Sequence, residues 1–295
     1  MPEQQEVPQQ QKEGWQQTLK GMNEMNLIDP NGLANYNAGI EVGRLHRGLG
    51  LIEFARTKEI LLEELPPAPA VIYDIGGAYG EYAYWLAEIG YEVHLFDLAE
   101  EHIRLAKDRA ESMPASLRAA EIADARSIPR SDASADAILL FGPLYHLVEA
   151  HDRRKCLEEC RRLLKTGGKL FTANITCFST ALNYTYLYDR KPVLDDDAYY
   201  YMVESTVKTG LHTGKEIGLV YFHRPEELRK EVAEAGFEDV ELRGVIGPGW
   251  IVRNVDEVWP DPVKREAIMR IVRLLEREES LMGFSTHFIS ISTRP

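Results

Sequence analysis

The stretch VIYDIGGAYGEYAYWLAEIG, residues 71–90, constrains the possible fold of this chain more than any other. It begins with mostly apolar, β-prone residues, as in a buried strand, and glycines follow as a turn. Tyr82, Leu86 and Ile89 then repeat at helical spacing until Gly90 ends the helix. A strand, a glycine turn and a helix in this order are typical of the first unit of a doubly wound α/β sheet.

Acidic residues at the ends of the first two predicted strands indicate a nucleoside site between them. Asp74 precedes the glycines and produces the pattern D-x-G-x-A-x-G, which differs from the G-x-G-x-x-G of dinucleotide-binding folds. A second apolar strand, predicted at 91–96, ends in Asp97, whose carboxylate can accept hydrogen bonds from both hydroxyls of a ribose. The pattern therefore disfavours a nicotinamide-dependent oxidoreductase.

The glycine turn, Asp97 and two later segments together resemble the class I S-adenosylmethionine-dependent methyltransferases. The later segments are EIADARSIP and the run from DAILLFGPLYHL to RRLLKTGGKLFTANI, so that the resemblance covers roughly residues 36–176. It implies an α/β fold with a doubly wound, seven-stranded, Rossmann-like sheet whose last strand is antiparallel. It also implies S-adenosylmethionine as the cofactor and S-adenosylhomocysteine as the product.

The resemblance also implies which residues bind the cofactor. The glycine turn lets the backbone approach the methionine part, Asp97 holds the ribose, Leu98 packs on the adenine, and Asp124 accepts from the adenine amino group. Ala78 stands where a third glycine is usual, and we expect a negative φ there. The predicted cofactor residues are Asp74, Gly76, Gly77, Ala78, Gly80, Asp97, Leu98, Asp124, Ala125, Phe141 and Arg44.

The resemblance and the hydrophobic periodicity predict how the chain is divided. We expect a flexible tail at 1–17, an N-terminal helical cover at 18–66 and a methyltransferase core at 67–295, with cover insertions at about 178–221 and 248–284. In the N-terminal cover, helices are expected around 33–49 and 51–65. Core strands are predicted near 71–75, 91–96, 117–122, 136–141, 169–176, 240–246 and 287–292. The second insertion contains a predicted amphipathic helix with Ile268, Ile271, Leu274 and Leu275.

Composition limits the partners. The chain has 295 residues, 44% of them hydrophobic, and a net charge of −13, which repels polyphosphates such as nucleic acids. No apolar run is long enough to span a membrane and the N-terminus lacks a signal-peptide core, so a cytoplasmic protein is expected. Of the three cysteines, Cys156 and Cys160 share a leucine-rich helical stripe and are predicted to pack in the core.

Methyl transfer requires an aligned acceptor and, for a protonated acceptor, a place for its proton. The fourth predicted strand ends in FGPLYHL, where the family presents residues to the acceptor. His146 is the first candidate for a general base or an acceptor-orienting group, and packing of a short helix is the alternative. Tyr145 is expected to face the acceptor or to pack on the adenosine. His223 is the second candidate base, although helix capping also explains its position.

A further group of candidates precedes the first strand, in YNAGIEVGRLHRGLGLIEFARTKEIL. Similar runs precede the first strand of many bacterial methyltransferase-like sequences. Tyr36 is predicted to act in catalysis, Glu41 to contact substrate, and Arg44 or Arg56 to bind a carboxylate with a bidentate guanidinium. The alternative is that these charges are ordinary surface groups. The remaining histidines form no recognisable constellation: His46, His94, His102, His151, His212 and His287.

These observations predict transfer of a methyl group, by in-line displacement, to O or N of a small-molecule acceptor. The aromatic-rich insertions favour a closed, partly apolar pocket. No spacing of metal ligands is evident, so no metal is expected. A monomer or homodimer is expected, without nucleic acid or membrane partners. The alternatives are a protein or RNA methyltransferase, and a non-catalytic sensor or scaffold that binds S-adenosylmethionine or S-adenosylhomocysteine.

Overall fold

The structure is a computed structural model, and it describes residues 29–186, 197–214 and 217–295. The predicted tail at 1–17 and the start of the predicted N-terminal cover lie outside the described residues. Within the described ranges, no helix is both long enough and apolar enough to cross a membrane.

A seven-stranded sheet organises the molecule, with the strand order β3-β2-β1-β4-β5-β9-β8. The first five strands pair in parallel, whereas β9 lies between β5 and β8 and runs antiparallel to both. The predicted α/β fold with an antiparallel last strand is confirmed. The strands are β1 (Val71–Ile75), β2 (Glu92–Asp97), β3 (Ala119–Ile122), β4 (Ala135–Phe141), β5 (Leu164–Ile175), β8 (Glu238–Gly244) and β9 (His287–Thr293).

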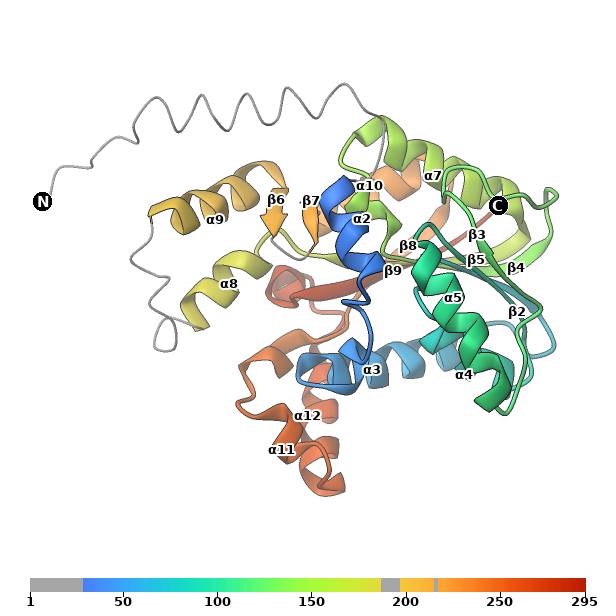
Figure 1. The fold of residues 1–295 in the computed structure, drawn as a ribbon. Coiled ribbons are helices and arrows are strands. Elements are labelled where there is room, and N and C mark those ends of the chain that lie inside the picture. Colours follow the sequence, from blue (N-terminus) through green and yellow to red (C-terminus); the bar gives the residue numbers. More distant parts are fainter. Residues whose placement is uncertain (1–28, 187–196, 215–216) are drawn as a thin grey trace, which may run out of the picture.

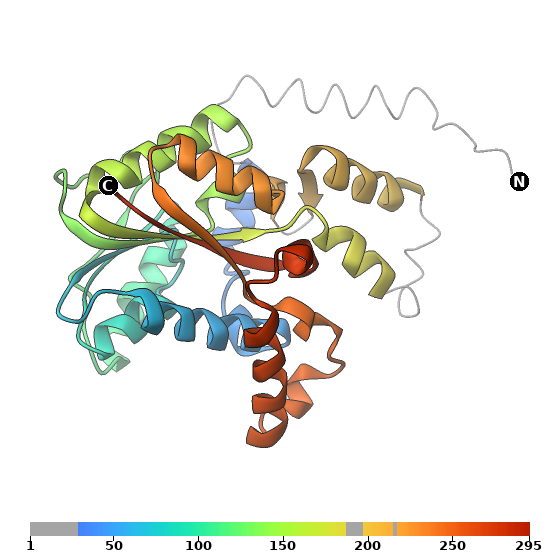
Figure 2. The ribbon, with the colours of Figure 1, turned by 180° about the vertical axis from the view of Figure 1, so that it is seen from behind.

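Helices cover both faces of this sheet (Figures 1 and 2). The helices α3 (Leu49–Glu64), α4 (Glu81–Glu88) and α5 (Glu100–Arg109) pack on one face. The helices α7 (Ala150–Leu163) and α10 (Pro225–Glu234) pack on the other. Since both faces are covered, most residues of the central strands β1 and β4 are buried.

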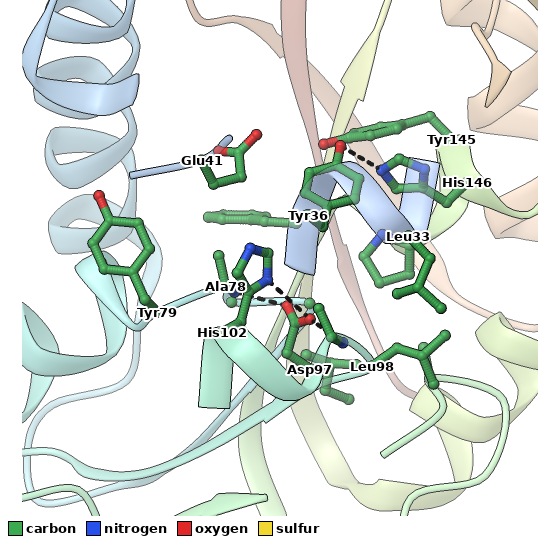
Figure 3. A pocket seen from close by; sticks show the side chains of 18 of the residues that line it. Leu33, Tyr36, Glu41, Ala78, Tyr79, Asp97, Leu98, His102, Tyr145 and His146 are labelled. Carbon is green, nitrogen blue, oxygen red and sulfur yellow. Dashed lines mark hydrogen bonds and ion pairs between the residues drawn. The ribbon is translucent and has the colours of Figure 1, made fainter. Parts of the chain in front are cut away.

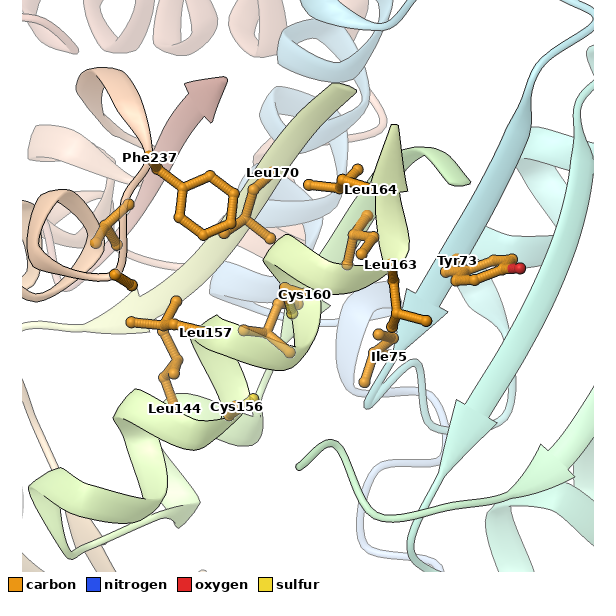
Figure 4. Packing of buried hydrophobic residues seen from close by; sticks show 14 of the residues in the cluster. Tyr73, Ile75, Leu144, Cys156, Leu157, Cys160, Leu163, Leu164, Leu170 and Phe237 are labelled. Atoms are coloured by element: carbon orange, nitrogen blue, oxygen red, sulfur yellow. The ribbon is translucent and has the colours of Figure 1, made fainter. Parts of the chain in front are cut away.

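The side chains of β4 show how the two layers of the core are divided. Ile138 and Leu140 belong to the cluster under α7, and Ala137 and Leu139 belong to the cluster under α3 and α4. Cys156 and Cys160 are fully buried in the α7 cluster (Figure 4), as predicted. Short helical segments, η2 (Ala110–Ser112) and α6 (Pro143–His146), follow α5 and β4.

The segment before β1 forms short helices instead of the continuous helix expected around 33–49. These are α2 (Pro30–Asn37) and the 3₁₀ turn η1 (Arg44–His46). Gly39, Gly43 and Gly48 adopt positive φ values of 82°, 74° and 53°, which interrupt a right-handed helix. The backbone conformation of these glycines, rather than the apolar periodicity, therefore determines where the helices of this segment end.

The insertion after β5 contains α8 (Ser179–Tyr186), α9 (Asp197–Thr209) and a hairpin of β6 (Leu211–Gly214) and β7 (Gly218–Tyr221). The sequence patterns did not predict this hairpin, because its strands are only four residues long. Asp29 connects the hairpin to α2: its carboxylate accepts from the backbone N–H of Leu219 at 2.6 Å and from that of Asn31 at 2.9 Å.

The insertion after β8 contains η4 (Gly247–Ile251), α11 (Val255–Val258), α12 (Pro262–Leu275) and η5 (Glu279–Phe284), and α11 and α12 project away from the sheet (Figure 1). The predicted amphipathic helix is present as α12, but two of the apolar residues named for it lie outside its buried stripe. Met269 and Val272 are buried, whereas Ile271 and Leu274 are 48% and 74% exposed. A projecting helix contacts its neighbours over a narrow stripe, so half of its apolar residues face outward.

Arg56 also differs from expectation, because it joins a buried ion-pair network. Its Nε and Nη2 donate to Glu276 at 2.5 and 2.9 Å, and Arg243 contacts Glu63 and Glu64 of α3. Arg56 is 2% exposed and lines none of the pockets described below. The network attaches α3 to β8 and to the end of α12.

Candidate active site

A pocket opens at the carboxyl ends of β1, β2 and β4, where chain connections leave to opposite sides of the sheet. The register pairs Ile75 with Phe96, so the glycine turn and Asp97 lie side by side. Most predicted site residues line this cofactor pocket (Figure 3): Gly76, Gly77, Ala78, Asp97, Leu98, Asp124, Ala125, Phe141, Arg44, Tyr36, Glu41, Tyr145 and His146.

The glycine turn packs so closely against its neighbours that no side chain fits at Gly76 or Gly77. Gly76 has φ of 77°, and a Cβ there would lie 2.5 Å from Cδ of Pro143. A Cβ at Gly77 would lie 2.4 Å from Oδ2 of Asp74. The negative φ expected at Ala78 is wrong, since its φ is 50°. This left-handed conformation costs an alanine about 1 kcal/mol, and a hydrogen bond from its N–H to Asp97 at 2.9 Å offsets the cost.

Asp97 is held in one orientation. Oδ2 accepts from Ala78 N–H, and Oδ1 accepts from Ala99 N–H at 2.8 Å and faces Nδ1 of His102 at 3.1 Å. A carboxylate offers about four lone-pair positions, so one remains on Oδ2 for a ribose hydroxyl. The residues present therefore fit a ribose with one direct contact, fewer than the two expected from the sequence.

His102 is a site residue that sequence reasoning missed. It lines the pocket, is 3% exposed, and packs edge-on against Tyr36. Its Nε2 is buried and has no hydrogen-bond partner within the described ranges. Its position in the first turn of α5, the helix that follows Asp97, is the sequence signal that could have indicated this role.

Asp74 and Gly80 support the turn without lining the pocket. Asp74 is fully buried, and burial together with the neighbouring charge of Asp97 raises its pKa to about 7. The Ala83 amide opposes this shift without completing a hydrogen bond. Gly80 has φ of 85° and forms the N-cap of α4. Their predicted role in cofactor binding is therefore indirect.

Asp124 lines the pocket where the resemblance predicts the adenine, and its carboxylate forms an ion pair. Arg126 contacts its carboxylate at 2.7 Å and also contacts Asp152 at 3.0 Å. Burial raises the pKa of Asp124, but the hydrogen bonds from Arg126 outweigh burial and hold that pKa below its usual value. Asp124 is thus a charged acceptor at the rim of the pocket.

Tyr36 and His146 form a neutral pair that also lines the cofactor pocket. The hydroxyl of Tyr36 lies 3.0 Å from Nε2 of His146 (Figure 3). Burial lowers the pKa of His146 to about 4 and raises the pKa of Tyr36 well above its usual range. Both groups are therefore uncharged near pH 7, and Nδ1 of His146 is buried without a hydrogen-bond partner in the described part of the chain.

A second cavity, here called the acceptor chamber, adjoins the cofactor pocket. Its polar lining includes Glu53 and Thr57 of α3, Asn174 of β5 and His287 of β9. Residues that line both cavities stand at their junction: Tyr36, Glu41, Arg44, Tyr82, Phe141 and Tyr145. The backbone N–H of Gly43 donates to the hydroxyl of Tyr79 at 2.8 Å, which fastens the N-terminal segment beside the pocket.

Arg44 reaches both cavities but already has partners. Its Nε donates to Glu41 at 2.7 Å, and Nη1 and Nη2 donate to Glu53 at 2.7 and 3.0 Å. A guanidinium has five N–H donors, so donors remain for the cofactor carboxylate predicted as its ligand. Glu41 and Arg44 form an ordered bridge over the junction rather than free surface charges.

The structure does not bring His223 to either cavity, which corrects its proposed catalytic role. Its side chain is fully buried, and Nε2 lies 3.2 Å from Glu231 of α10. Its ring packs edge-on against Tyr221, and its backbone bridges to Ile175. His223 therefore packs the insertion onto the core. Among the described residues, no three His, Cys, Asp or Glu side chains form a potential metal site.

The sheet order and the pocket at its switch point define a protein with the methyltransferase fold. A family model described as a methyltransferase domain matches residues 72–168. The ubiquinone/menaquinone biosynthesis C-methyltransferase UbiE of Acidiphilium cryptum (strain JF-5) is 27% identical over 199 residues, which cover 62% of this chain and 72% of the relative. The methyltransferase GfsG of Streptomyces halstedii is 31% identical over 128 residues, 42% of this chain and 45% of the relative.

Solved structures show the same fold at low sequence identity. A methyltransferase from Methanosarcina mazei is 18% identical with a TM-score of 0.53, covering 79% of this chain and 96% of that one. The Haemonchus contortus phosphoethanolamine N-methyltransferase 2, in complex with S-adenosyl-L-methionine, is 16% identical with a TM-score of 0.53, covering 82% and 52%. Residues 72–168 thus match a methyltransferase domain, and the chain has the fold of the S-adenosylmethionine-dependent methyltransferases.

Proposed function

We propose that this methyltransferase transfers a methyl group to O or N of a small molecule held in the acceptor chamber. One observation carries the proposal: the chamber shares its junction residues with the cofactor pocket and is lined by segments distant in sequence. Ile217 lines it from the first insertion, Val245 follows β8, and Phe288 belongs to β9. A recessed cavity of this kind suits a small acceptor better than a protein or RNA chain.

The cofactor would be held mainly by backbone and by Asp97. The turn at Gly76 and Gly77 lines the pocket with backbone, Oδ2 of Asp97 has a lone pair for the ribose, and Leu98 and Ala125 supply apolar contact for the adenine. When bound there, S-adenosylmethionine supplies an activated methyl group on a sulfonium.

The remaining lining residues would bind and orient the acceptor. The hydroxyl of Tyr36 is fixed by His146, and Tyr145 packs at a ring-centroid distance of 4.7 Å from the same imidazole. Because burial keeps this pair neutral, we assign it an orienting role by hydrogen bonding. Glu41 would contact the acceptor from across the junction.

Two further assignments concern partners and location. A net charge of −13 supports the absence of a nucleic-acid substrate. Three free, buried cysteines support a reducing compartment such as the cytoplasm. We expect a monomer or homodimer.

The experiment that tests the proposal has two stages. Calorimetric titration with S-adenosylhomocysteine should show binding, and NAD should show none. Methyl-labelled S-adenosylmethionine is then incubated with phenols, amines, carbon acids, a protein mixture and RNA. Carbon acids belong in the panel because one relative is named a C-methyltransferase. Label in small phenols or amines supports the proposal, whereas label only in protein or RNA contradicts it. Binding without transfer to any acceptor would favour a sensor or scaffold.

A further inference from the structure

We propose that His287, oriented by Glu53, takes the proton from the hydroxyl of a phenol or enol bound in the acceptor chamber. The inference rests on the proposed function and deepens it by naming a substrate class and a proton acceptor. His287 and Glu53 lie on β9 and α3, and both line the chamber.

The contact with Glu53 favours one tautomer of His287. Its Nδ1 lies 3.1 Å from Oε2 of Glu53. A carboxylate can only accept a hydrogen bond, so this contact favours a proton on Nδ1, which leaves the lone pair on Nε2. Within the described ranges, no hydrogen bond or ion pair occupies Nε2, and the His287 side chain is 29% exposed. Nε2 is thus available to a ligand in the chamber.

Glu53 is well suited to support this histidine. Its side chain is 13% exposed and accepts two hydrogen bonds from Arg44. Burial opposes ionisation, but Arg44 and His287 outweigh it and hold the pKa of Glu53 well below its usual range. A carboxylate that stays charged can stabilise the imidazolium that forms when Nε2 accepts a proton.

His146 is a poorer proton acceptor by the same criteria. Its Nε2 already lies 3.0 Å from the hydroxyl of Tyr36, and no carboxylate among the described residues contacts its Nδ1. Burial lowers its pKa to about 4, so it gains a proton only with difficulty. The two histidines therefore have different roles: His146 orients the acceptor, and His287 accepts its proton.

The proton transfer balances without any further reactant. The O–H bond of the acceptor breaks, an N–H bond forms at Nε2, and the oxygen keeps the electron pair with which it attacks the methyl carbon. The imidazolium beside Glu53 returns its proton to solvent after the product leaves. An imidazole can deprotonate a phenol or an enol, whereas an aliphatic alcohol is too weak an acid for this base.

The chamber walls support a planar acceptor. Aromatic rings and branched side chains line it: Phe141, Tyr82, Tyr145, Ile175, Ile217 and Phe288. Asn174 is 1% exposed, and its Nδ2 donates to Thr172 at 2.8 Å. Its Oδ1 is left buried without a partner in the described part of the chain. We therefore expect a ring with an acidic hydroxyl and a second hydrogen-bond donor directed at Asn174.

Other charged and titratable groups lie near His287 and must be considered in any pH profile. Besides Glu53, those that line the chamber come from the N-terminal segment, α4 and α6: Tyr36, Glu41, Arg44, Tyr82 and Tyr145. Arg47 and His212 line a further cavity that also reaches Glu53 and His287. Arg44 is engaged by Glu41 and Glu53.

The first test uses 4-nitrophenol, whose phenolate is coloured, with the protein saturated with S-adenosylhomocysteine. If His287 accepts its proton, bound 4-nitrophenol should ionise at a lower pH than free 4-nitrophenol, by about tenfold in acid dissociation constant. The His287→Gln and Glu53→Gln variants should abolish this shift. His46→Gln is the matched control, because His46 also contacts a carboxylate, Glu81 at 3.0 Å, but its side chain is 52% exposed and lines neither cavity. It should behave like the wild type.

The second test follows the wild-type protein by NMR and kinetics, so it does not depend on a variant that folds. The titration midpoint of the His287 ring should match the acid limb of kcat/KM for a phenolic acceptor. His287→Gln should lower kcat about 100-fold and remove that limb, with unchanged affinity for S-adenosylhomocysteine.

Three results would overturn the inference: no binding of 4-nitrophenol, the same ionisation shift in His287→Gln, or an acid limb that survives in this variant. Failure of the proposed function looks different. In that case the wild-type protein would bind no S-adenosylhomocysteine or would label no small molecule, whatever happens to bound 4-nitrophenol.

Discussion

The carboxylate of Asp97, at the end of β2, accepts a hydrogen bond from the backbone N–H of Ala78 at 2.9 Å. This bond joins the second strand to the glycine turn after the first, and the cofactor pocket lies over the junction. Asp97 therefore shapes the turn, in addition to the ribose contact proposed for it.

Replacing Asp97 with Ala should weaken S-adenosylhomocysteine binding, because a charged acceptor and the support of the turn are both lost. We expect a loss of about 2 to 3 kcal/mol, or roughly 30- to 150-fold in Kd, by calorimetry. Asp108→Asn, at an exposed aspartate of α5, is the control. Unchanged affinity in Asp97→Ala would remove Asp97 from the site.

Replacing His146 with Ala, or Tyr36 with Phe, should slow methyl transfer while leaving cofactor affinity almost unchanged. The reason is that each change breaks the 3.0 Å contact that orients the pair. We expect a loss of roughly 10- to 100-fold in kcat/KM, measured with an acceptor found in the screen. Tyr200→Phe, at a 53% exposed tyrosine, should have no effect. Full activity of both variants would contradict the orienting role.

Asp74 should make the stability of the protein depend on pH. Its pKa is about 7 in the folded state, because burial and Asp97 raise it, against about 3.9 in an unfolded chain. The folded protein therefore binds more protons between these values, and its stability should fall as pH rises from about 4 to 7.

The Asp74→Asn variant tests this sign, since Asn imitates the protonated acid. Its thermal midpoint should exceed that of the wild type by more at pH 8 than at pH 5. Expressed as the free energy of unfolding, the difference between the variant and the wild type should change by about 1 kcal/mol for each unit of the pKa shift. A difference that does not vary with pH would show that Asp74 ionises normally.

Arg56 should contribute to the stability of the fold and not to the affinity for the cofactor. Removing one partner of its buried contact with Glu276 leaves an uncompensated charge, so Arg56→Ala should cost about 3 to 5 kcal/mol in urea unfolding. Arg104→Ala removes an exposed ion pair on α5 and should leave the urea midpoint almost unchanged. S-adenosylhomocysteine affinity should be equal in wild type and both variants, and a large loss in Arg56→Ala alone would place Arg56 in the site after all.

Local patterns in the sequence were sufficient to predict the sheet. The run from Val71 to Gly90, the acids at 74 and 97 and the later apolar strands specify a strand, a turn and a helix through short-range periodicity and turn chemistry. Because carboxyl ends of parallel strands share one edge, these patterns also indicated which residues would gather at the pocket. Thus His146, Tyr145 and Asp97 could be selected as candidates before their contacts were known.

Tertiary packing determined the features of individual residues that the local sequence patterns could not predict. The outward rotation of Ile271 and Leu274, the positive φ of Ala78 and the burial of His223 depend on which neighbours each residue meets. The contact between Glu53 and His287 has no local signature at all, because α3 and β9 meet only when the sheet is assembled. A sequence therefore determines elements through near neighbours, whereas a site built from opposite ends of the chain is determined by long-range packing.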